Sequence, residues 1–124
     1  MSTKILIMDD EVDTLTMLAM TLKFSGYEVA TAETGAQAIT LVTEFQPDVI
    51  ILDVMMPDIS GIDVLKRLKQ TLAVVPPTIF LSASVRPSDQ AEGLAAGAYT
   101  YLVKPVLRQK LVETLKLALA TKPH

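Results

Sequence analysis

The sequence predicts an α/β domain in which helices cover both faces of a parallel sheet. Short runs of β-branched and aliphatic residues alternate with segments of helical spacing, and no repeat, linker or low-complexity segment divides the 124 residues. Strands that alternate with helices are joined by right-handed βαβ crossovers, which place the strands in parallel. We therefore expect one domain over residues 1–124, with no separate effector domain.

Five segments have the length and composition of strands. In chain order they are KILIM (4–8), EVATA (28–32), VIILD (49–53), TIFLS (78–82) and TYLVK (100–104). The third begins with four apolar residues in succession, the pattern of a strand that is buried on both faces. It is therefore predicted to lie at the centre of the sheet.

The segments between these runs show the spacing and end signals of helices. Gly26 and Gly97 stand where the residue after a helix C-cap belongs, and Pro87 indicates the start of the fourth helix. Leucines recur at helical spacing in the first helix, at positions 15, 18 and 22, and in the last, at positions 107, 111, 115 and 119. Four methionines, at positions 17, 20, 55 and 56, are interpreted as soft packing residues.

The composition excludes several function classes. Without cysteine, the chain has no thiolate metal site, disulfide or thiol redox chemistry. Half of the residues are hydrophobic, but charges or prolines interrupt every apolar run, and the N-terminus lacks the pattern of a secretory signal. A soluble cytoplasmic protein is expected. The net charge of -3 favours a protein partner over a nucleic acid or a membrane.

Polar residues follow four of the five predicted strands, at the edge where ligands bind in such sheets. Asp9 and Asp10 follow the first strand, and Asp53, Ser82 and Lys104 close the third, fourth and fifth. If the first and third strands are neighbours, three carboxylates converge and require a counter-charge. Mg²⁺, which prefers oxygen ligands, would neutralise the site together with Lys104.

An aspartate beside Mg²⁺ and a lysine is a candidate nucleophile toward a phosphoryl group. The product, an acyl phosphate, is labile and resets by hydrolysis. The hydroxyl of Ser82 could hydrogen-bond the new phosphoryl oxygens and be drawn toward them, which would give a local movement for the protein to amplify.

These motifs resemble the receiver domain of two-component response regulators (CheY-like). The resemblance rests on DDE after the first strand, D-x-x-M-P-x-x-x-G from Asp53, S-A at the end of the fourth strand and K-P after the fifth, and it covers essentially the whole chain. It implies a flavodoxin-like sheet of order 2-1-3-4-5. It also implies that Asp53 accepts a phosphoryl group from a histidine kinase or histidine phosphotransfer protein, and that the domain catalyses only its own phosphorylation and dephosphorylation.

The resemblance further implies a ligand set for the metal. Asp10 would bind Mg²⁺ directly, Asp9 mostly through water, and Asp53 and the main-chain carbonyl of Met55 would complete the protein ligands. Mn²⁺ is a second candidate.

The remaining roles implied by the resemblance concern the switch. Lys104 would pair with the phosphoryl group, and its peptide bond to Pro105 would be cis. Ser82 would be the switch hydroxyl and Tyr101 the aromatic side chain that turns inward with it. Met55 and Ser84 would tune the rate of dephosphorylation.

Structural interpretations of the same residues stay open. Asp9 and Asp10 could cap the following helix, and Asp53 could be a loop acid. Lys104 taken singly is most often a surface residue, Ser82 could simply fill a turn, and Tyr101 could pack in the core.

The same residues argue against three other functions. A phosphatase of the dehalogenase-like class needs an acid two residues after the nucleophile, where this chain has Met55. A flavodoxin-like carrier would repel its cofactor phosphate from the acidic MDDEVDT loop. A degenerate receiver that binds partners without phosphorylation would not need the full residue set.

Output is expected through the face formed by the fourth helix, fifth strand and fifth helix. It would occur by protein binding, phosphorylation-dependent dimerisation or phosphorelay. If the chain is excised from a larger protein, a missing domain would carry the output.

Overall fold

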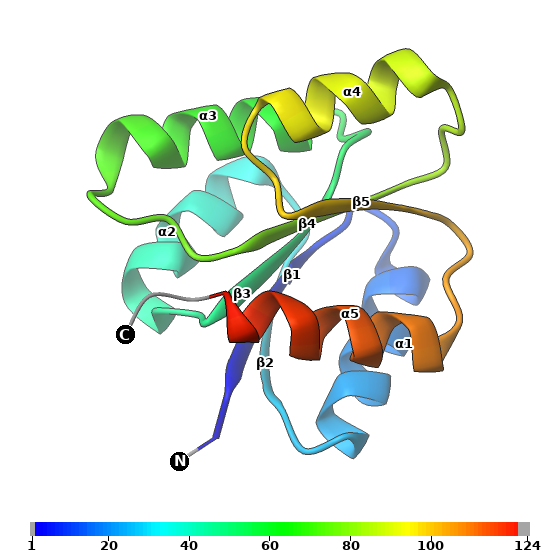
Figure 1. Ribbon diagram of the computed structural model, residues 1–124. Coiled ribbons are helices and arrows are strands. Elements are labelled where there is room, and N and C mark those ends of the chain that lie inside the picture. Colours follow the sequence, from blue (N-terminus) through cyan, green and yellow to red (C-terminus); the bar gives the residue numbers. More distant parts are fainter. Residues whose placement is uncertain (1, 122–124) are drawn as a thin grey trace.

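A computed structural model describes residues 2–121 as a five-stranded parallel sheet with helices on both faces (Figure 1). Strands and helices alternate: β1 (Lys4–Met8), α1 (Val12–Phe24), β2 (Glu28–Ala32), α2 (Gly35–Phe45), β3 (Val49–Asp53), α3 (Gly61–Thr71), β4 (Thr78–Ser82), α4 (Pro87–Ala95), β5 (Thr100–Val103) and α5 (Arg108–Ala120). The strand order is β2-β1-β3-β4-β5. The predicted fold class and order are confirmed.

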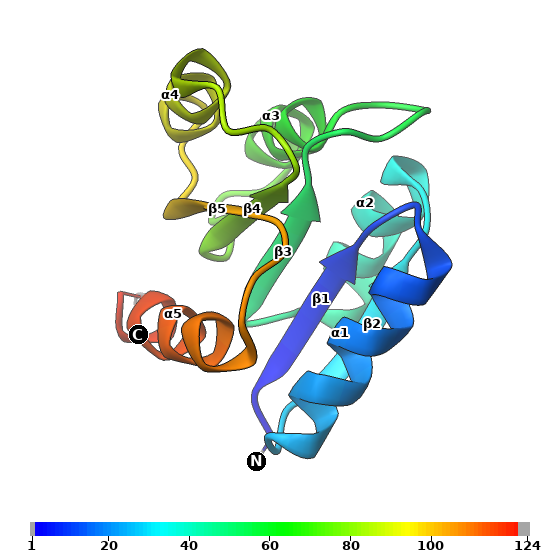
Figure 2. The ribbon, with the colours of Figure 1, turned by 90° about the vertical axis from the view of Figure 1, so that its right-hand side faces the viewer.

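The sheet separates two apolar cores because side chains on a strand alternate between its faces. On one face, Ile5 and Ile7 of β1 pack with α1 and α5, and on the other, Leu6 and Met8 pack with α2 and α3. Figures 1 and 2 show the same division, with α4 on the side of α2 and α3. Among residues 2–121, none of these helices is long and apolar enough to cross a membrane.

The central strands are buried along their whole length. Every residue of β3 and of β4 is buried, whereas β2 and β5 lie at the edges of the sheet. This explains the unbroken apolar run before Asp53.

The polar side chains of Asp9, Asp53 and Ser82 are buried at the carboxyl ends of β1, β3 and β4. Because burying polar groups is costly, their presence indicates a functional site at that edge of the sheet.

Two predicted boundaries differ by one residue. The fifth strand ends at Val103, because Pro105 has no N–H with which to extend the ladder beyond Lys104. The last helix begins at Arg108, and Leu107 is its N-cap in an extended conformation. Leu107 is 78% exposed, so its predicted place on the apolar face of the helix is wrong.

The packing role expected for the methionines is correct only for Met56, which contacts the α2–α3 core. Met17, Met20 and Met55 expose 63%, 65% and 64% of their surface. In α1 the residues on the buried face include Leu15 and Leu22, and Met17 and Met20 lie on its outward face. Met55 lies in the loop after β3.

Candidate functional site

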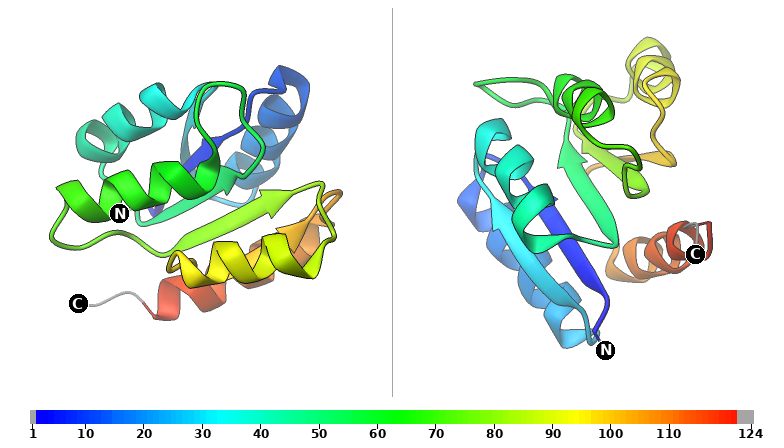
Figure 3. Two further views of the ribbon diagram at one scale, coloured as in Figure 1. Left: turned by 90° about the horizontal axis from the view of Figure 1, so that it is seen from above. Right: turned by 90° about the vertical axis from the view of Figure 1, so that its left-hand side faces the viewer.

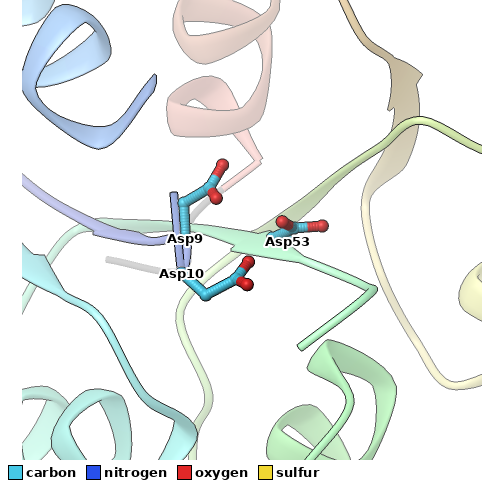
Figure 4. A group of neighbouring side chains, drawn as sticks. All are labelled: Asp9, Asp10 and Asp53. Atoms are coloured by element: carbon cyan, nitrogen blue, oxygen red, sulfur yellow. The ribbon is translucent and has the colours of Figure 1, made fainter. Parts of the chain in front are cut away.

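Three carboxylates meet at the carboxyl ends of β1 and β3. The two strands are paired in register, Met8 opposite Leu52, so the residues that follow Met8 lie next to Asp53. One oxygen from each of Asp9, Asp10 and Asp53 lies within 4.8 Å of the others. Figure 4 shows Asp9 and Asp10 at the end of β1 beside Asp53 at the end of β3. The predicted convergence is confirmed.

The ammonium group of Lys104 bridges two of these carboxylates. Its Nζ donates to Asp9 Oδ2 at 2.7 Å and to Asp53 Oδ2 at 3.1 Å. Both acids are buried and Lys104 is nearly so, which excludes the interpretation of Lys104 as a solvated surface residue. Its main-chain N–H donates to the carbonyl of Ser82 at 2.8 Å, and its peptide bond to Pro105 is cis.

Burial and hydrogen bonding shift the pKa values of Asp53 and Lys104. Burial raises the pKa of Asp53 to about 6 from an ordinary value of 3.8, against the hydrogen bond and charge of Lys104, which lower it. Burial also lowers the pKa of Lys104, but the hydrogen bonds to Asp9 and Asp53 outweigh it, and the pKa lies above its usual value. The ionised form of Asp53 is therefore less favoured than that of an exposed aspartate, and further positive charge at the site would lower this pKa.

The donor set fits a hard divalent cation. The cluster offers only carboxylate oxygens, and three carboxylates against one ammonium group leave two negative charges. A divalent cation would bring that sum to zero, and Mg²⁺ accepts such a small number of carboxylates together with water. Asp10 is exposed while Asp9 and Asp53 are buried, so the cluster can be reached from solvent on the Asp10 side.

Asp9 also makes a local hydrogen bond, which bears on its interpretation as a helix cap. Its Oδ1 accepts the N–H of Glu11 at 2.9 Å. Glu11 is the N-cap of α1, and its own side chain makes no capping hydrogen bond. Asp9 thus orders the turn into α1 with one oxygen and holds Lys104 with the other.

The loop after β3 contributes its main chain to the site. The N–H of Met55 donates to Asp53 Oδ1 at 3.1 Å, so each oxygen of Asp53 has a hydrogen bond of its own. The Met55 side chain points outward. Gly61, the first residue of α3, lies so close to Asp53 that a Cβ there would be 2.3 Å from the Asp53 carbonyl oxygen. Asp53 is therefore contacted by the following loop at its carboxylate and by α3 at its main-chain carbonyl.

A second polar group joins the ends of β4 and β5. Ser82 is fully buried, and its Oγ accepts the N–H of Ser84 at 3.2 Å. The Ser84 hydroxyl donates to Asp89 in α4, and the Ser84 carbonyl accepts the Tyr101 hydroxyl at 3.4 Å. Tyr101 is half-buried and packs edge-on against Phe80, with ring centroids 6.5 Å apart. It has both a core contact and a polar link to the Ser82 loop.

Two acids in this region were missed by the sequence analysis. Asp89 accepts from Ser84 and from Nε of Arg86, which is 3.0 Å away. Its position in the first turn of a predicted helix was an available signal. Asp58 accepts the N–H of Gly35. No local pattern connects residues 23 positions apart, so this pair could not have been found from the sequence.

The chain matches the family model described as "Response regulator receiver domain" over residues 5–116. It is 42% identical over 118 residues to the transcriptional regulatory protein PrrA of Mycobacterium tuberculosis, covering 95% of this chain and 50% of that protein. It is 40% identical over 116 residues to the phosphate regulon transcriptional regulatory protein PhoB of Pseudomonas aeruginosa, covering 93% and 51%. The chain spans about half the length of the curated relatives it matches.

Solved structures agree with these sequence matches. The fold resembles the chemotaxis protein CheY4 of Vibrio cholerae with a TM-score of 0.88 and 34% identity, over 95% of this chain and 99% of that one. It resembles a response regulator receiver domain protein of Clostridium thermocellum with a TM-score of 0.88 and 32% identity, over 95% and 94%.

Proposed function

The chain belongs to the response regulator receiver domain family, and from that premise we propose that it is a phosphorylation-dependent switch in which Asp53 accepts the phosphoryl group. The observation that carries the proposal is the convergence of Asp9, Asp10 and Asp53 beside the ammonium group of Lys104. A fixed nucleophile, oxygen ligands for a cation and a positive charge are the parts that phosphoryl transfer requires.

In the transfer step, a carboxylate oxygen of Asp53 forms a bond to phosphorus as the bond from phosphorus to the donor imidazole nitrogen breaks. The imidazole keeps the electron pair and takes up a proton, and Asp53 becomes an acyl phosphate. Water later cleaves the phosphoryl group as inorganic phosphate and restores the carboxylate. On this proposal the domain turns over no other substrate and catalyses only these two steps on itself.

Asp9, Asp10 and Asp53, with the main-chain carbonyl of Met55, would hold Mg²⁺ or Mn²⁺. When bound, the cation neutralises charge on the phosphoryl oxygens. Lys104 already lies 3.1 Å from Asp53 Oδ2 and is the group that would pair with the phosphoryl oxygens on the other side. The exposed side chain of Met55, and Ser84 at the mouth of the site, are the positions proposed to tune hydrolysis.

The switch itself would run from Ser82 to Tyr101. A phosphoryl group on Asp53 offers new acceptors to the Ser82 hydroxyl, and a movement of Ser82 would disturb the hydrogen bond that it accepts from Ser84. Within residues 2–121 the Tyr101 hydroxyl hydrogen-bonds the carbonyl of Ser84 alone, at 3.4 Å, so a shift of this loop would release it. Tyr101 could then turn inward.

The surface around the site supports a protein as the phosphodonor, either a histidine kinase or a histidine phosphotransfer protein. A groove of about 440 Å³ lies between α1 and the start of α5, and Met17, Lys104 and Pro105 line it. Val12 and Leu107, which are 54% and 78% exposed, stand two residues after the Asp9–Asp10 and Lys104–Pro105 pairs in the chain. An apolar surface this close to the acceptor suits a protein partner better than a small, charged donor.

A second surface supports output through protein contacts. Apolar side chains are exposed on the β4–α4 loop, α4, the turn before β5 and α5: Val85, Leu94, Tyr99 and Leu117. They lie on the elements next to Ser82 and Tyr101, so a partner or a second copy of this chain could sense the switch there. We propose that residues 1–124 act as the receiver unit, in the cytoplasm, and signal by protein binding, dimerisation or phosphorelay, with no nucleic acid or membrane contact of their own.

The test is intact mass spectrometry of the chain incubated with Mg²⁺ and acetyl phosphate, beside the variants Asp53→Asn and Asp63→Asn. Asp63 is an exposed acid in the first turn of α3 and serves as the matched control. We expect one phosphoryl adduct in the wild type and in the control, none in Asp53→Asn and none in the wild type with a chelator. An adduct that survives in Asp53→Asn would overturn the assignment.

A second variant, Lys104→Ala, separates acceptance from switching. We expect it to accept a phosphoryl group while the NMR signals of Ser82 and Tyr101 fail to shift as they do in the phosphorylated wild type. A wild-type response in this variant would show that Lys104 has no part in the switch.

A further inference from the structure

The β3–α3 loop, residues 54–60, holds the main chain of Met55 against the acceptor. The Met55 N–H reaches Asp53 Oδ1, and the loop ends at Gly61, whose N–H donates to the carbonyl of Val54 at 3.0 Å. This hydrogen bond closes the base of the loop. The outer part of the loop needs another support if Met55 is to keep a fixed position.

That support comes from α2. The N–H of Gly35, the first residue of α2, donates to both carboxylate oxygens of Asp58, at 2.9 and 3.2 Å. Figure 2 and the left view of Figure 3 show the loop between β3 and α3 extending beyond the sheet beside the start of α2. The N–H groups of Ile59, Gly35 and Ala36, in that order, lower the pKa of Asp58, so the carboxylate is ionised where α2 presents unpaired N–H groups.

A close apolar contact accompanies this hydrogen bond. A Cβ on Gly35 would lie 2.6 Å from Cγ1 of Ile59, so only glycine allows the loop to approach α2 this closely. Ile59 is half-buried and packs against the α2–α3 core. The loop therefore meets α2 through adjacent polar and apolar contacts.

These contacts complete a ring of linked segments around the carboxylates. On one side, the N–H of Asp9 donates to the carbonyl of Ala32 at the end of β2, at 3.1 Å. The chain continues from Ala32 to Gly35, Gly35 binds Asp58, and the loop returns to Met55 and Asp53. Lys104 joins the carboxylates of Asp9 and Asp53 directly. Asp58 adds a second side-chain link, on the outer side of the site, between the half built on β1 and β2 and the half built on β3.

We propose that Asp58 is a positioning residue for the phosphoryl-acceptor site: by binding the Gly35 N–H it holds the β3–α3 loop so that the main chain of Met55 stays fixed beside Asp53. The inference rests on the proposed function only for its consequence in phosphorylation. Its structural part, the position of Met55, holds in the metal-free protein.

The experiment compares the variants Asp58→Ala and Asp58→Asn with wild type and with Asp63→Ala. Asp63 is an exposed acid only five residues further along and hydrogen-bonds no other segment among the interactions of residues 2–121, so its removal controls for the lost charge. The first readout is hydrogen exchange at the Met55 N–H, measured by NMR without metal. The second is the Mg²⁺ concentration that half-saturates the amide shifts of the Asp9–Asp10 segment.

We expect the Met55 N–H of Asp58→Ala to exchange about tenfold faster than in wild type. The half-saturating Mg²⁺ concentration should rise about tenfold, the lower end of the effects of residues that orient metal ligands. Asp58→Asn keeps an oxygen acceptor for Gly35 and should lie nearer to wild type than to Asp58→Ala. Asp63→Ala should change neither readout.

Two results would overturn the assignment: Asp58→Ala with the Met55 exchange and Mg²⁺ dependence of wild type, or Asp63→Ala with changes as large as those of Asp58→Ala. Neither readout requires phosphorylation. If the wild type accepted no phosphoryl group, the proposed function would fail. Hydrogen exchange at the Met55 N–H would still test the role of Asp58.

Discussion

Helices α3 and α4 lie on the same face of the sheet and follow adjacent strands, but they are attached to it very differently (Figure 1). The buried residues of α3 are Gly61, Ile62, Val64, Leu65 and Leu68, whereas the only buried residue of α4 is Gly93. Ser60 caps α3 by accepting the N–H of Asp63, and Arg86 at the start of α4 makes no such hydrogen bond.

The difference matches the residues that precede the two helices. Asp53, before α3, is the proposed acceptor and must keep one geometry for phosphoryl transfer. Ser82, before α4, is the proposed switch hydroxyl and must move. Polar contacts, such as those that Ser84 makes to Asp89 and Tyr101, can be exchanged for others at little net free energy, whereas buried apolar contacts cannot. The helix after the proposed acceptor is thus held mainly by packing, and the loop after the proposed switch hydroxyl mainly by hydrogen bonds.

The largest expected effect tests this contrast in packing directly. Leu65→Ala in α3 removes a buried side chain, and Leu94→Ala in α4 removes one that is 48% exposed. We expect losses in free energy of unfolding of about 2–5 kcal/mol for the first and about 0.5 kcal/mol for the second, measured by urea denaturation followed by circular dichroism. Equal losses would mean that α4 is as firmly packed as α3.

A matched pair of glycine substitutions sharpens the contrast. In Gly61→Ala, the new Cβ would lie 2.3 Å from the Asp53 carbonyl oxygen, part of a buried strand that cannot yield, and we expect a loss of about 3 kcal/mol. In Gly93→Ala, it would meet the rings of Phe80 and Tyr101 at 3.0 and 3.1 Å. A loosely held α4 can shift, and alanine favours the helix by about 1 kcal/mol, so the net change should be near zero. A large loss in Gly93→Ala would contradict the mobility assigned to α4.

The buried carboxylate of Asp53 predicts that the free energy of unfolding depends on pH. Because the pKa of Asp53 is about 6 in the folded chain and near 3.8 when unfolded, the folded state binds more protons between these values. Stability from this group is therefore fully present below about pH 3.8 and is lost as the pH rises through 6.

In Asp53→Asn the side chain does not ionise, so the variant does not lose stability as the pH rises through 6. With a chelator present, we expect the variant to be more stable than wild type by about 2 kcal/mol at pH 7, with a difference near zero at pH 4. Denaturation at both pH values, and at pH 7 with Mg²⁺, measures it. Mg²⁺ should narrow the gap at pH 7 by stabilising the wild type, and a wild type more stable than the variant at pH 7 without metal would refute the prediction.

The smallest effect is expected in the switch region. Tyr101→Phe removes one long hydrogen bond, to the carbonyl of Ser84, and keeps the ring contact with Phe80. We expect a loss of about 0.5 kcal/mol or less in unfolding free energy, and no change in phosphoryl acceptance by mass spectrometry. A loss above about 2 kcal/mol would support a purely structural role for the hydroxyl.

The sequence could predict the parts of this protein that depend on local patterns. The five strand runs are read from side-chain period and composition, and a residue at the end of a parallel strand must lie at the ligand-binding edge. The places of Asp9, Asp10, Asp53 and Lys104 at this edge are therefore predictable from the sequence. For Lys104 even the position was correct to within one residue of the strand end.

Contacts between segments that no sequence period connects could be known only from the three-dimensional fold. The hydrogen bond between Asp58 and Gly35, the outward face of Met17 and Met20, and the exposure of Leu107 depend on how one loop or helix lies against another. The same is true of the loose packing of α4, because apolar composition alone does not say which side chains find a partner. Local periodicity determines where strands end and which side chains meet at that edge, while the lateral packing of loops and helices determines how firmly each part of the edge is packed.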